Sequence, residues 1–413
     1  MKFFTSMHSS QKSHSLIIVL ILNLAFFAGI GISLSQTPTH GQCLRYKLPT
    51  TNGPSITVNN LEELENAIRE ANAKNNITIL LEDGVYDLKR QVFIKGNNVT
   101  IRSGSGNRKN VIIRGKGMAG SIPHIFEVVG KNFTAADLTI GGVKYHGIQI
   151  HGENNADGPL IHNLRILDTG QQMIKVSHNS KTGTGADKGI VEWCSFEYSA
   201  GVGPDYYIGG IDAHHAGDWV VRNNHFQGIR SPEKALAEYA IHFWSESSNT
   251  LVEKNTIVAC DRGIGFGLGD RGHQGGMIRN NMIFTTRDVG IGLENSSNTK
   301  IYNNTIYSLI YRNSIEYRFL RSRGISIINN LTNAPITARN GGKATLSNNV
   351  TDAKPYWFIG ADRGDLHLNG TIQGATNRGL FLTDVLDDID CESRIRSGSV
   401  DVGADERILY PAK

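Results

Sequence analysis

The chain has 413 residues, of which 39% are hydrophobic, and it carries 42 lysines and arginines against 38 aspartates and glutamates. The formal net charge is only +4, and the basic residues are scattered rather than gathered in blocks, which excludes nucleic acid as an expected partner. The apolar content is enough for a large core.

Residues 1–35 have the pattern of an export signal. Lys2 and Lys12 precede an apolar run from Leu16 to Leu34, and no acidic residue lies before that run. This order is typical of a signal peptide, although the run is also long enough to serve as an uncleaved anchor. We expect cleavage before Gln36, contact with a membrane only if the segment is retained, and an extracytoplasmic location that is either periplasmic or secreted.

The cysteine content fits an oxidising compartment. An exported chain with four cysteines can form up to two disulfides, and their spacing does not resemble a zinc site. The four are Cys43, Cys194, Cys260 and Cys391.

A helix is predicted near the start of the folded region. Residues 61–68, LEELENAI, place apolar side chains at helical spacing, and residues 77–86, ITILLEDGVY, read as a strand that follows it. An amphipathic helix here would cover the open apolar end of a repeat fold. We therefore expect a linker over 36–55, a solenoid over 56–351, and a segment over 352–413 that closes the same domain.

One short apolar strand recurs along the middle of the chain. Its alternating pattern sends Ile, Val, Phe and Leu side chains inward and the residues between them outward. The copies are residues 147–151, 174–177, 211–214, 241–244, 264–267 and 291–294. The glycine-rich copy GIGFGLG, residues 263–269, fits this alternation, so we interpret it as a strand and expect no nucleotide as a partner.

A second repeat places an asparagine pair after an apolar residue. The second asparagines of the pairs are 31, 26, 23, 26 and 19 residues apart, and a period in the twenties with variable insertions is typical of a solenoid. Stacked asparagines can turn the chain and bond to each other from coil to coil. They are Asn224, Asn255, Asn281, Asn304, Asn330 and Asn349.

Together these features resemble the right-handed parallel β-helix proteins of the pectate-lyase-like superfamily. The helix, the segment ITILLEDGVYDL, the asparagine coils and the tails Asp365–Leu368 and Asp401–Glu406 carry the resemblance, which spans about residues 55–406. It implies an all-β fold: a single-stranded right-handed parallel β-helix, or solenoid, with an N-terminal capping helix. The superfamily contains polysaccharide lyases, hydrolases, epimerases and binding proteins, so the fold alone does not choose a reaction.

Aligning the recurring strands converts the sequence into a map of the outward face, since successive coils stack about 4.8 Å apart. The first outward column reads Gln149, Lys175, Asp212, His242, Gly265, Gly292, and the second reads His151, Ser177, His214, Trp244, Gly267, Glu294. Titratable side chains gather on three neighbouring coils beside a glycine floor. We expect Lys175, Asp212, His214 and His242 to be catalytic, with Trp244 as an aromatic platform for a sugar.

Further outward residues and long flanking loops supply candidates for substrate binding. We expect this role for His151, Arg230, Trp244, Arg262, Arg271 and His273. Basic side chains on the flanking loops could meet an acidic polymer.

A column of carboxylates, Glu238, Asp261 and Asp288, requires a positive partner. Calcium is one candidate for that partner. We favour Arg262 and Arg287 over calcium as the positive partner, because each lies next to a carboxylate in the sequence.

The preferred function is β-elimination on a uronate-containing, acidic polysaccharide by a monomeric enzyme. In this scheme Lys175 or His242 is the base, His214 the acid and Asp212 the orienting group, while Arg230 or Arg262 neutralises the substrate carboxylate. A glycoside hydrolase using Glu238 and Asp261, a C5-epimerase, and a solenoid that only binds glycans remain as alternatives. Convergence of the four catalytic candidates would favour the enzyme.

Overall fold

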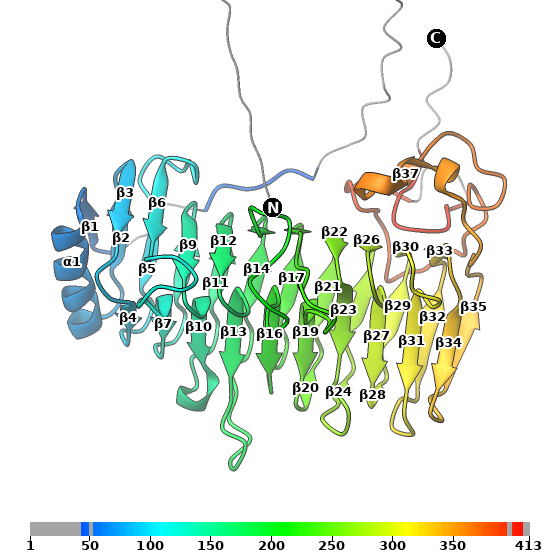
Figure 1. Cartoon of the computed structure of the whole chain (residues 1–413), viewed down its shortest axis with the longest axis horizontal. Helices are drawn as coiled ribbons and strands as arrows, with labels where there is room; N and C mark the ends of the chain where they lie inside the picture. The colour runs from blue at the N-terminus through cyan, green and yellow to red at the C-terminus, as the bar shows by residue number, and fades with distance from the viewer. Residues whose placement is uncertain (1–42, 49–52, 395–398, 408–413) are drawn as a thin grey trace, which may run out of the picture. The chain divides into compact units, whose positions relative to one another are not determined.

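The computed structural model describes residues 43–48, 53–394 and 399–407, which belong to the compact unit Gly41–Lys413. The export signal predicted over residues 1–35 lies outside the described residues. Among the helices that are described, none is long and apolar enough to cross a membrane. The described chain winds through three long parallel sheets, A, B and C, as Figure 1 shows.

Sheet A has twelve strands, and neighbours in space are one coil apart in sequence. In order they are β1 (Ser55–Val58), β2 (Thr78–Leu81), β5 (Thr100–Ser103), β8 (Thr134–Ala136), β11 (Leu160–His162), β14 (Ile190–Glu192), β17 (Val220–Arg222), β21 (Leu251–Glu253), β25 (Met277–Arg279), β29 (Lys300–Tyr302), β32 (Ile325–Ile328) and β35 (Ala344–Ser347).

Sheet B has ten strands and follows sheet A in each coil. They are β3 (Gly84–Asp87), β6 (Val111–Arg114), β9 (Thr139–Val143), β12 (Arg165–Thr169), β15 (Ser195–Glu197), β18 (His225–Gln227), β22 (Thr256–Cys260), β26 (Met282–Thr285), β30 (Thr305–Ser308) and β33 (Leu331–Thr332).

Sheet C completes the coil and carries the predicted outward columns. Its ten strands are β4 (Val92–Ile94), β7 (His124–Val128), β10 (His146–His151), β13 (Ile174–Ser177), β16 (Ile211–His214), β19 (Tyr239–Trp244), β23 (Arg262–Phe266), β27 (Ile291–Glu294), β31 (Ile315–Arg318) and β34 (Ile336–Arg339). A small sheet of β20 (Ser247–Ser248), β24 (His273–Gln274) and β28 (Ser296–Ser297) stacks beside it. The predicted parallel solenoid is confirmed.

The predicted asparagine ladder runs along the turn between sheets A and B. The Asn255 side-chain amide donates to Asn281 Oδ1 at 3.0 Å, and Asn281 donates to Asn304 at 2.9 Å; the same contact joins each successive pair from Asn224 to Asn349. The residue before each ladder asparagine has a positive φ, between 50° and 58°. Five of these six residues are asparagines, which tolerate this conformation well, and the sixth is Lys254. The ladder therefore both turns the chain and satisfies its buried amides.

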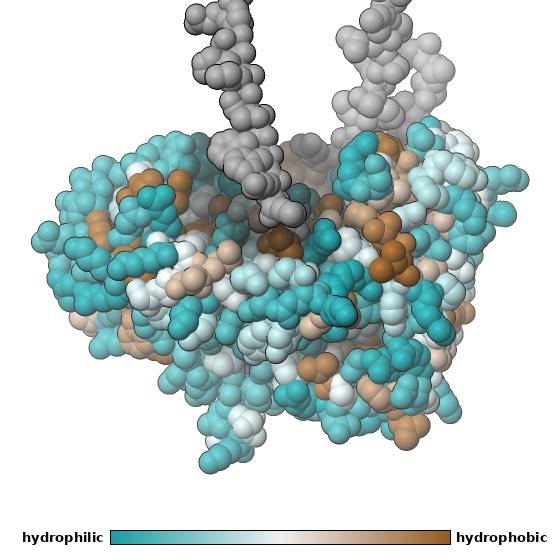
Figure 2. All heavy atoms as spheres, in the orientation of Figure 1, coloured by the Kyte–Doolittle hydropathy of each residue, from teal (hydrophilic) through white to brown (hydrophobic). Residues whose placement is uncertain are grey.

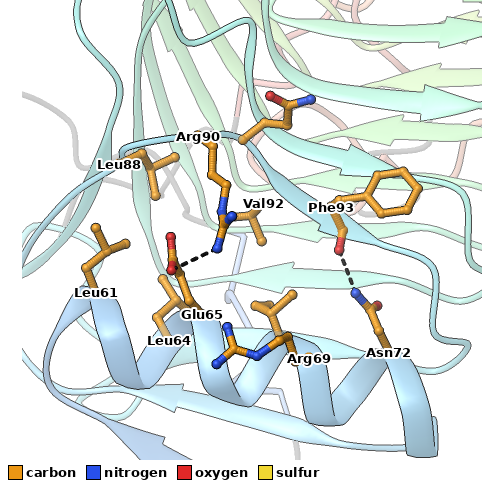
Figure 3. A pocket seen from close by; sticks show the side chains of 11 residues that line it. Leu61, Leu64, Glu65, Arg69, Asn72, Leu88, Arg90, Val92 and Phe93 are labelled. Carbon is orange, nitrogen blue, oxygen red and sulfur yellow. Dashed lines mark hydrogen bonds and ion pairs between the residues drawn. The ribbon is translucent and has the colours of Figure 1, made fainter.

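Helix α1 (Leu61–Lys74) covers the N-terminal end of the solenoid, as predicted, and extends six residues beyond the predicted helix. Asn60 caps it by accepting a hydrogen bond from the Glu63 amide. Its buried face, which includes Leu64 and Ile68, packs on the first coils. A hollow of about 360 Å³ lies between α1 and β4, where Arg90 of the β3–β4 loop pairs with a glutamate of the helix (Figure 3).

A ladder of alternating charge crosses the outer face of sheet A. Glu192 pairs with Arg222, and Glu253 pairs with Arg279 one coil further on. Although burial raises the pKa of Glu192, hydrogen bonds from His162, from Tyr46 of the N-terminal segment and from Arg222 lower it to about 2. The segment 43–48 is thereby fastened to the middle of the solenoid.

The predicted closing segment folds back along the solenoid. It contains the 3₁₀ turns η2 (Pro355–Trp357) and η3 (Ala361–Arg363) and the antiparallel pair β36 (Phe358–Gly360) and β37 (Asp365–Leu368). A disulfide joins Cys43 to Cys391. Cys194 and Cys260 are free and buried, so one of the two disulfides that were possible is present. Figure 2 shows that the outer surface in this view is mostly hydrophilic, with scattered apolar patches.

Candidate functional site

The register of sheet C confirms the predicted first column. Gln149 pairs with Lys175, Lys175 with Asp212, and Asp212 with His242. The same register carries the column on to Gly265 and Gly292. In the second column, His151 lies opposite Ser177 and His214 lies opposite Trp244.

Three of the four predicted catalytic side chains meet in one hydrogen-bonded cluster. Lys175 Nζ contacts Asp212 Oδ2 and lies 2.9 Å from His214 Nε2, while His214 Nε2 lies 3.4 Å from Asp212 Oδ2. Lys175 and His214 are 14% and 15% exposed, whereas Asp212 is buried beneath them. Burial raises the pKa of Asp212, but the His214 hydrogen bond and the Lys175 charge outweigh burial and hold it well below its usual range. The carboxylate is therefore an anion that orients both neighbours.

The fourth residue, His242, lies under the cluster rather than in it. Its Nδ1 is 3.6 Å from Asp212 Oδ1, its Nε2 is 3.2 Å from the Gly267 carbonyl oxygen, and its side chain is only 1% exposed. Burial lowers the pKa of His242 more than Asp212 and Glu238 raise it, so the ring is neutral at neutral pH. The Trp244 ring stacks beside it at 5.4 Å, and with so little of its side chain exposed His242 does not face a substrate.

Trp244 is not the open platform that the sequence suggested. It is buried, its indole N–H donates to Asp212 Oδ1 at 2.6 Å, and its ring meets His214 edge-on at 4.3 Å. The Arg271 guanidinium covers the ring at 3.9 Å. The β-turn after β23, closed by hydrogen bonds between Leu268 and Arg271, holds this arginine there. Arg271 is exposed and its guanidinium has no hydrogen-bond partner among the described residues.

The glycine floor predicted beside the cluster is filled by Tyr239. A Cβ at Gly265 would lie 2.6 Å from the Tyr239 ring, and a Cβ at Gly292 would lie 2.3 Å from its hydroxyl oxygen. Arg262 covers the Tyr239 ring at 5.3 Å and pairs with Asp288. The glycines are therefore required by packing, and Tyr239 is a site residue that the sequence reading missed.

The other predicted binding residues divide into exposed and buried groups. His151 is partly exposed, and its two ring nitrogens face Glu153 at 2.7 Å and Glu127 at 3.2 Å. Glu127 stands two coils before Lys175 in the first column, which could have been found by extending the alignment to β7. Arg230 is half-buried in the loop between β18 and β19, where its charge lies close to Cys260.

His273 does not face a substrate, contrary to the prediction. It is buried, it bonds Thr250 Oγ1 through Nε2 at 2.9 Å, and it stacks on Phe266 at 4.0 Å. Burial lowers its pKa to about 3. The histidine is part of the packing between sheet C and the small sheet.

Two of the three carboxylates in the column pair with arginines, as favoured. Asp261 is fully buried, pairs with Arg287 at 3.2 Å, and accepts hydrogen bonds from the backbone amides of Ser231 and Ala237. Asp288 pairs with Arg262 at 3.1 Å. Glu238 stands apart, 3.8 Å from His242 Nδ1. Among these described residues, the three carboxylates do not converge on one point where they could bind calcium. Because Asp261 is buried, it cannot act with Glu238 as the pair of catalytic carboxylates of a hydrolase.

A different group of ligand-type side chains lies in the closing segment. One nitrogen or oxygen each of His367, Asp390 and Asp405 lie within 4.8 Å of one another. The two ring nitrogens of His367, however, bond to Asp365 at 2.6 Å and to Asp390 at 3.0 Å. Although burial lowers its pKa, the surrounding aspartates raise it to about 9, so His367 is an imidazolium that ties this segment together.

Comparison with known proteins agrees with this architecture. The family model described as "Right handed beta helix region" matches residues 146–351, which include sheet C from β10 to β34. This chain is a right-handed parallel β-helix protein. The pectate lyase Pel9A has a similar structure, with a TM-score of 0.53 and 12% identity over 82% of this chain and 90% of that chain.

An alginate lyase from Paenibacillus sp. str. FPU-7 gives a TM-score of 0.49 and 16% identity over 72% of this β-helix chain and 95% of that chain. No curated protein matches the sequence. At 12% identity the likeness to Pel9A shows the fold alone, and the reaction must be argued from the site.

Proposed function

We propose that the protein is an extracytoplasmic polysaccharide lyase that cleaves a uronate-containing chain by β-elimination on the outer face of sheet C. The observation that carries this proposal is the Lys175, Asp212 and His214 cluster lying beside Arg271, a guanidinium pinned over Trp244 and free to bind an anion. The name of Pel9A, a pectate lyase, makes polygalacturonate the natural first substrate to test.

The reaction assigns a separate task to each exposed group. Arg271 binds the C6 carboxylate, which makes the C5 proton more acidic. Lys175 first passes a proton to His214 Nε2, 2.9 Å away. The resulting amine removes the C5 proton, the C5 electrons form the C4–C5 double bond, and the C4–O bond breaks. His214, in contact with Lys175 Nζ, protonates the leaving oxygen. Asp212 holds both side chains in place, and His242 supports Asp212 from below without touching the substrate.

The sequence predicted that Arg230 or Arg262 binds the substrate carboxylate, and we now propose Arg271 for this role. Arg262 is engaged with Asp288 and the Tyr239 ring, and Arg230 lies on the margin toward sheet B. Arg271 alone of the three is exposed and adjacent to the cluster through Trp244. A C5-epimerase would use the same groups and return a proton to the opposite face, so product analysis must separate the two reactions.

The experiment measures formation of unsaturated product by ultraviolet absorbance on pectate, alginate and glycosaminoglycans. We expect Lys175→Ala and His214→Ala each to lower kcat by 10²–10⁴-fold, which is the usual contribution of general acid or base catalysis. Arg271→Ala should mainly raise KM. Lys343→Ala, at an exposed lysine between β34 and β35 away from the cluster, is the matched control and should retain activity.

A chelator arm tests the metal independently. Because arginines pair with Asp261 and Asp288, we expect activity to persist in the chelator. Unchanged activity in the Lys175 and His214 variants would overturn the catalytic assignment. Glycan binding by wild-type protein without any product would instead favour the alternative function, a solenoid that only binds glycans.

A further inference from the structure

Two tyrosines stand exposed on the loop that leads into the strand of Asp212 and His214. The loop joins β15 to β16, and in it Tyr206 is 48% exposed and Tyr207 is 45% exposed. Their hydroxyl groups have no hydrogen-bond partner within the described ranges, and no described aromatic ring packs on theirs. By contrast Tyr145, two coils earlier on the same margin, lies against the rings of His124 and His146.

The loop that carries the two tyrosines is anchored on both sides. Ser199 donates to Asp168 of the preceding coil through its amide and its hydroxyl, each at 2.8 Å. The Gly203 amide donates to the Arg230 carbonyl of the following coil at 2.9 Å. Asp205 accepts from the Tyr207 amide at 2.7 Å, and the adjoining Ile208 is fully buried. A loop anchored on both sides thus holds two large aromatic side chains in water, where their ring faces are accessible to a ligand.

The position of the loop relates these tyrosines to the proposed active site. A Cβ at Gly209 would lie 3.3 Å from both Gln172 and Glu238, so this residue belongs to the margin of sheet C just before the first column. Tyr207 precedes Asp212 by five residues, which span at most about 17 Å of extended chain. Trp244 lies in the second column, and Arg271, on the turn after β23, lies beyond it at the opposite margin. A sugar chain crossing the cluster has room for a few units between the two margins.

We propose that Tyr206 and Tyr207 form a remote subsite that stacks on a pyranose ring several units away from the bond that is cleaved. This inference rests on the proposed function and adds to it a preference for long oligosaccharides. The tyrosines offer apolar ring faces to the C–H groups of a sugar, and their free hydroxyl groups can bond to its hydroxyl groups. Arg271 binds the carboxylate of the uronate at one margin of sheet C, and the two tyrosines bind a sugar unit further along the oligosaccharide at the other margin.

The test compares oligosaccharides of increasing length on the full chain. Binding is measured by calorimetry in the Lys175→Ala background, which prevents turnover, on uronate oligomers of two to eight units. We expect the double variant Tyr206→Ala/Tyr207→Ala to weaken binding about tenfold for the longest oligomer, with a loss that shrinks as the oligomer shortens. Tyr206→Phe/Tyr207→Phe should recover most of that loss. Tyr356→Ala, at 72% exposure in the closing segment, is the matched control.

The possible binding results distinguish the remote subsite from the proposed function. A loss that grows with length supports the remote subsite. Equal binding of every oligomer by the double variant and its parent overturns the subsite and leaves the proposed function intact. A length-independent loss assigns the tyrosines to the cluster itself and also overturns the subsite. A parent protein that binds none of the uronate oligomers contradicts both the proposed function and the subsite.

Discussion

The asparagine ladder predicts a large and position-dependent loss of stability on substitution of Asn281. Its side chain donates to the Val252 and Arg279 carbonyl oxygens and to Asn304 Oδ1, at 2.9–3.0 Å, and accepts from the amide and side chain of Asn255 at 3.0 Å. Asn281→Ala removes these five contacts in a fully buried position. At about 1 kcal/mol for each hydrogen bond, the expected loss is about 3–5 kcal/mol in the free energy of unfolding.

The last step of the ladder supplies the internal comparison. Asn349 is half-buried, donates only to the Ile327 carbonyl oxygen, and accepts from the amide and side chain of Asn330. Asn349→Ala should therefore cost about 1–2 kcal/mol. Urea unfolding followed by far-ultraviolet circular dichroism measures both variants against wild type. Equal losses at the two positions, or a loss below about 1 kcal/mol for Asn281→Ala, would refute the role assigned to the ladder.

Three further predictions concern the closing segment and the floor of the site. Cys391→Ser should lower the free energy of unfolding by about 3–5 kcal/mol because it opens a very long loop, and a reductant should lower the wild-type melting temperature similarly. Burial raises the pKa values of Asp388 and Glu406 to about 7 from near 4, so the folded chain binds protons that the unfolded chain releases. The melting temperature should therefore fall as pH rises from about 4 through 7, and Asp388→Asn should flatten that profile in differential scanning fluorimetry. Gly265→Ala should destabilise by about 1–3 kcal/mol through its clash with Tyr239, and the loss should shrink in a Tyr239→Ala background.

Periodic features of this chain were predictable from the sequence, and features set by the course of the loops were not. The strands of sheet C repeat with strict alternation, so aligning them gave the correct partner for Lys175, Asp212 and His242 in the column. The asparagine spacing gave the ladder in the same way. Both depend on local pattern, which the sequence carries directly.

The burial of individual outward residues depends on loops whose course has no period. The turn after β23 brings Arg271 over the Trp244 ring. The indole therefore offers no open face to a sugar, and it instead donates to Asp212 and stacks on His242. Tyr239 crosses two coils to fill the glycine positions. The pairing of Cys43 likewise follows from the return of the closing segment, which no spacing along the chain indicates.

The most direct test of the central claim is the chemistry of the product. Wild-type protein and Lys175→Ala are incubated with polygalacturonate and alginate in water enriched in heavy oxygen, and the fragments are analysed by mass spectrometry. We predict fragments with an unsaturated end, no heavy oxygen in the new ends, and almost no fragments from the Lys175→Ala variant. Saturated fragments that carry heavy oxygen, or equal fragmentation by both proteins, would contradict this prediction.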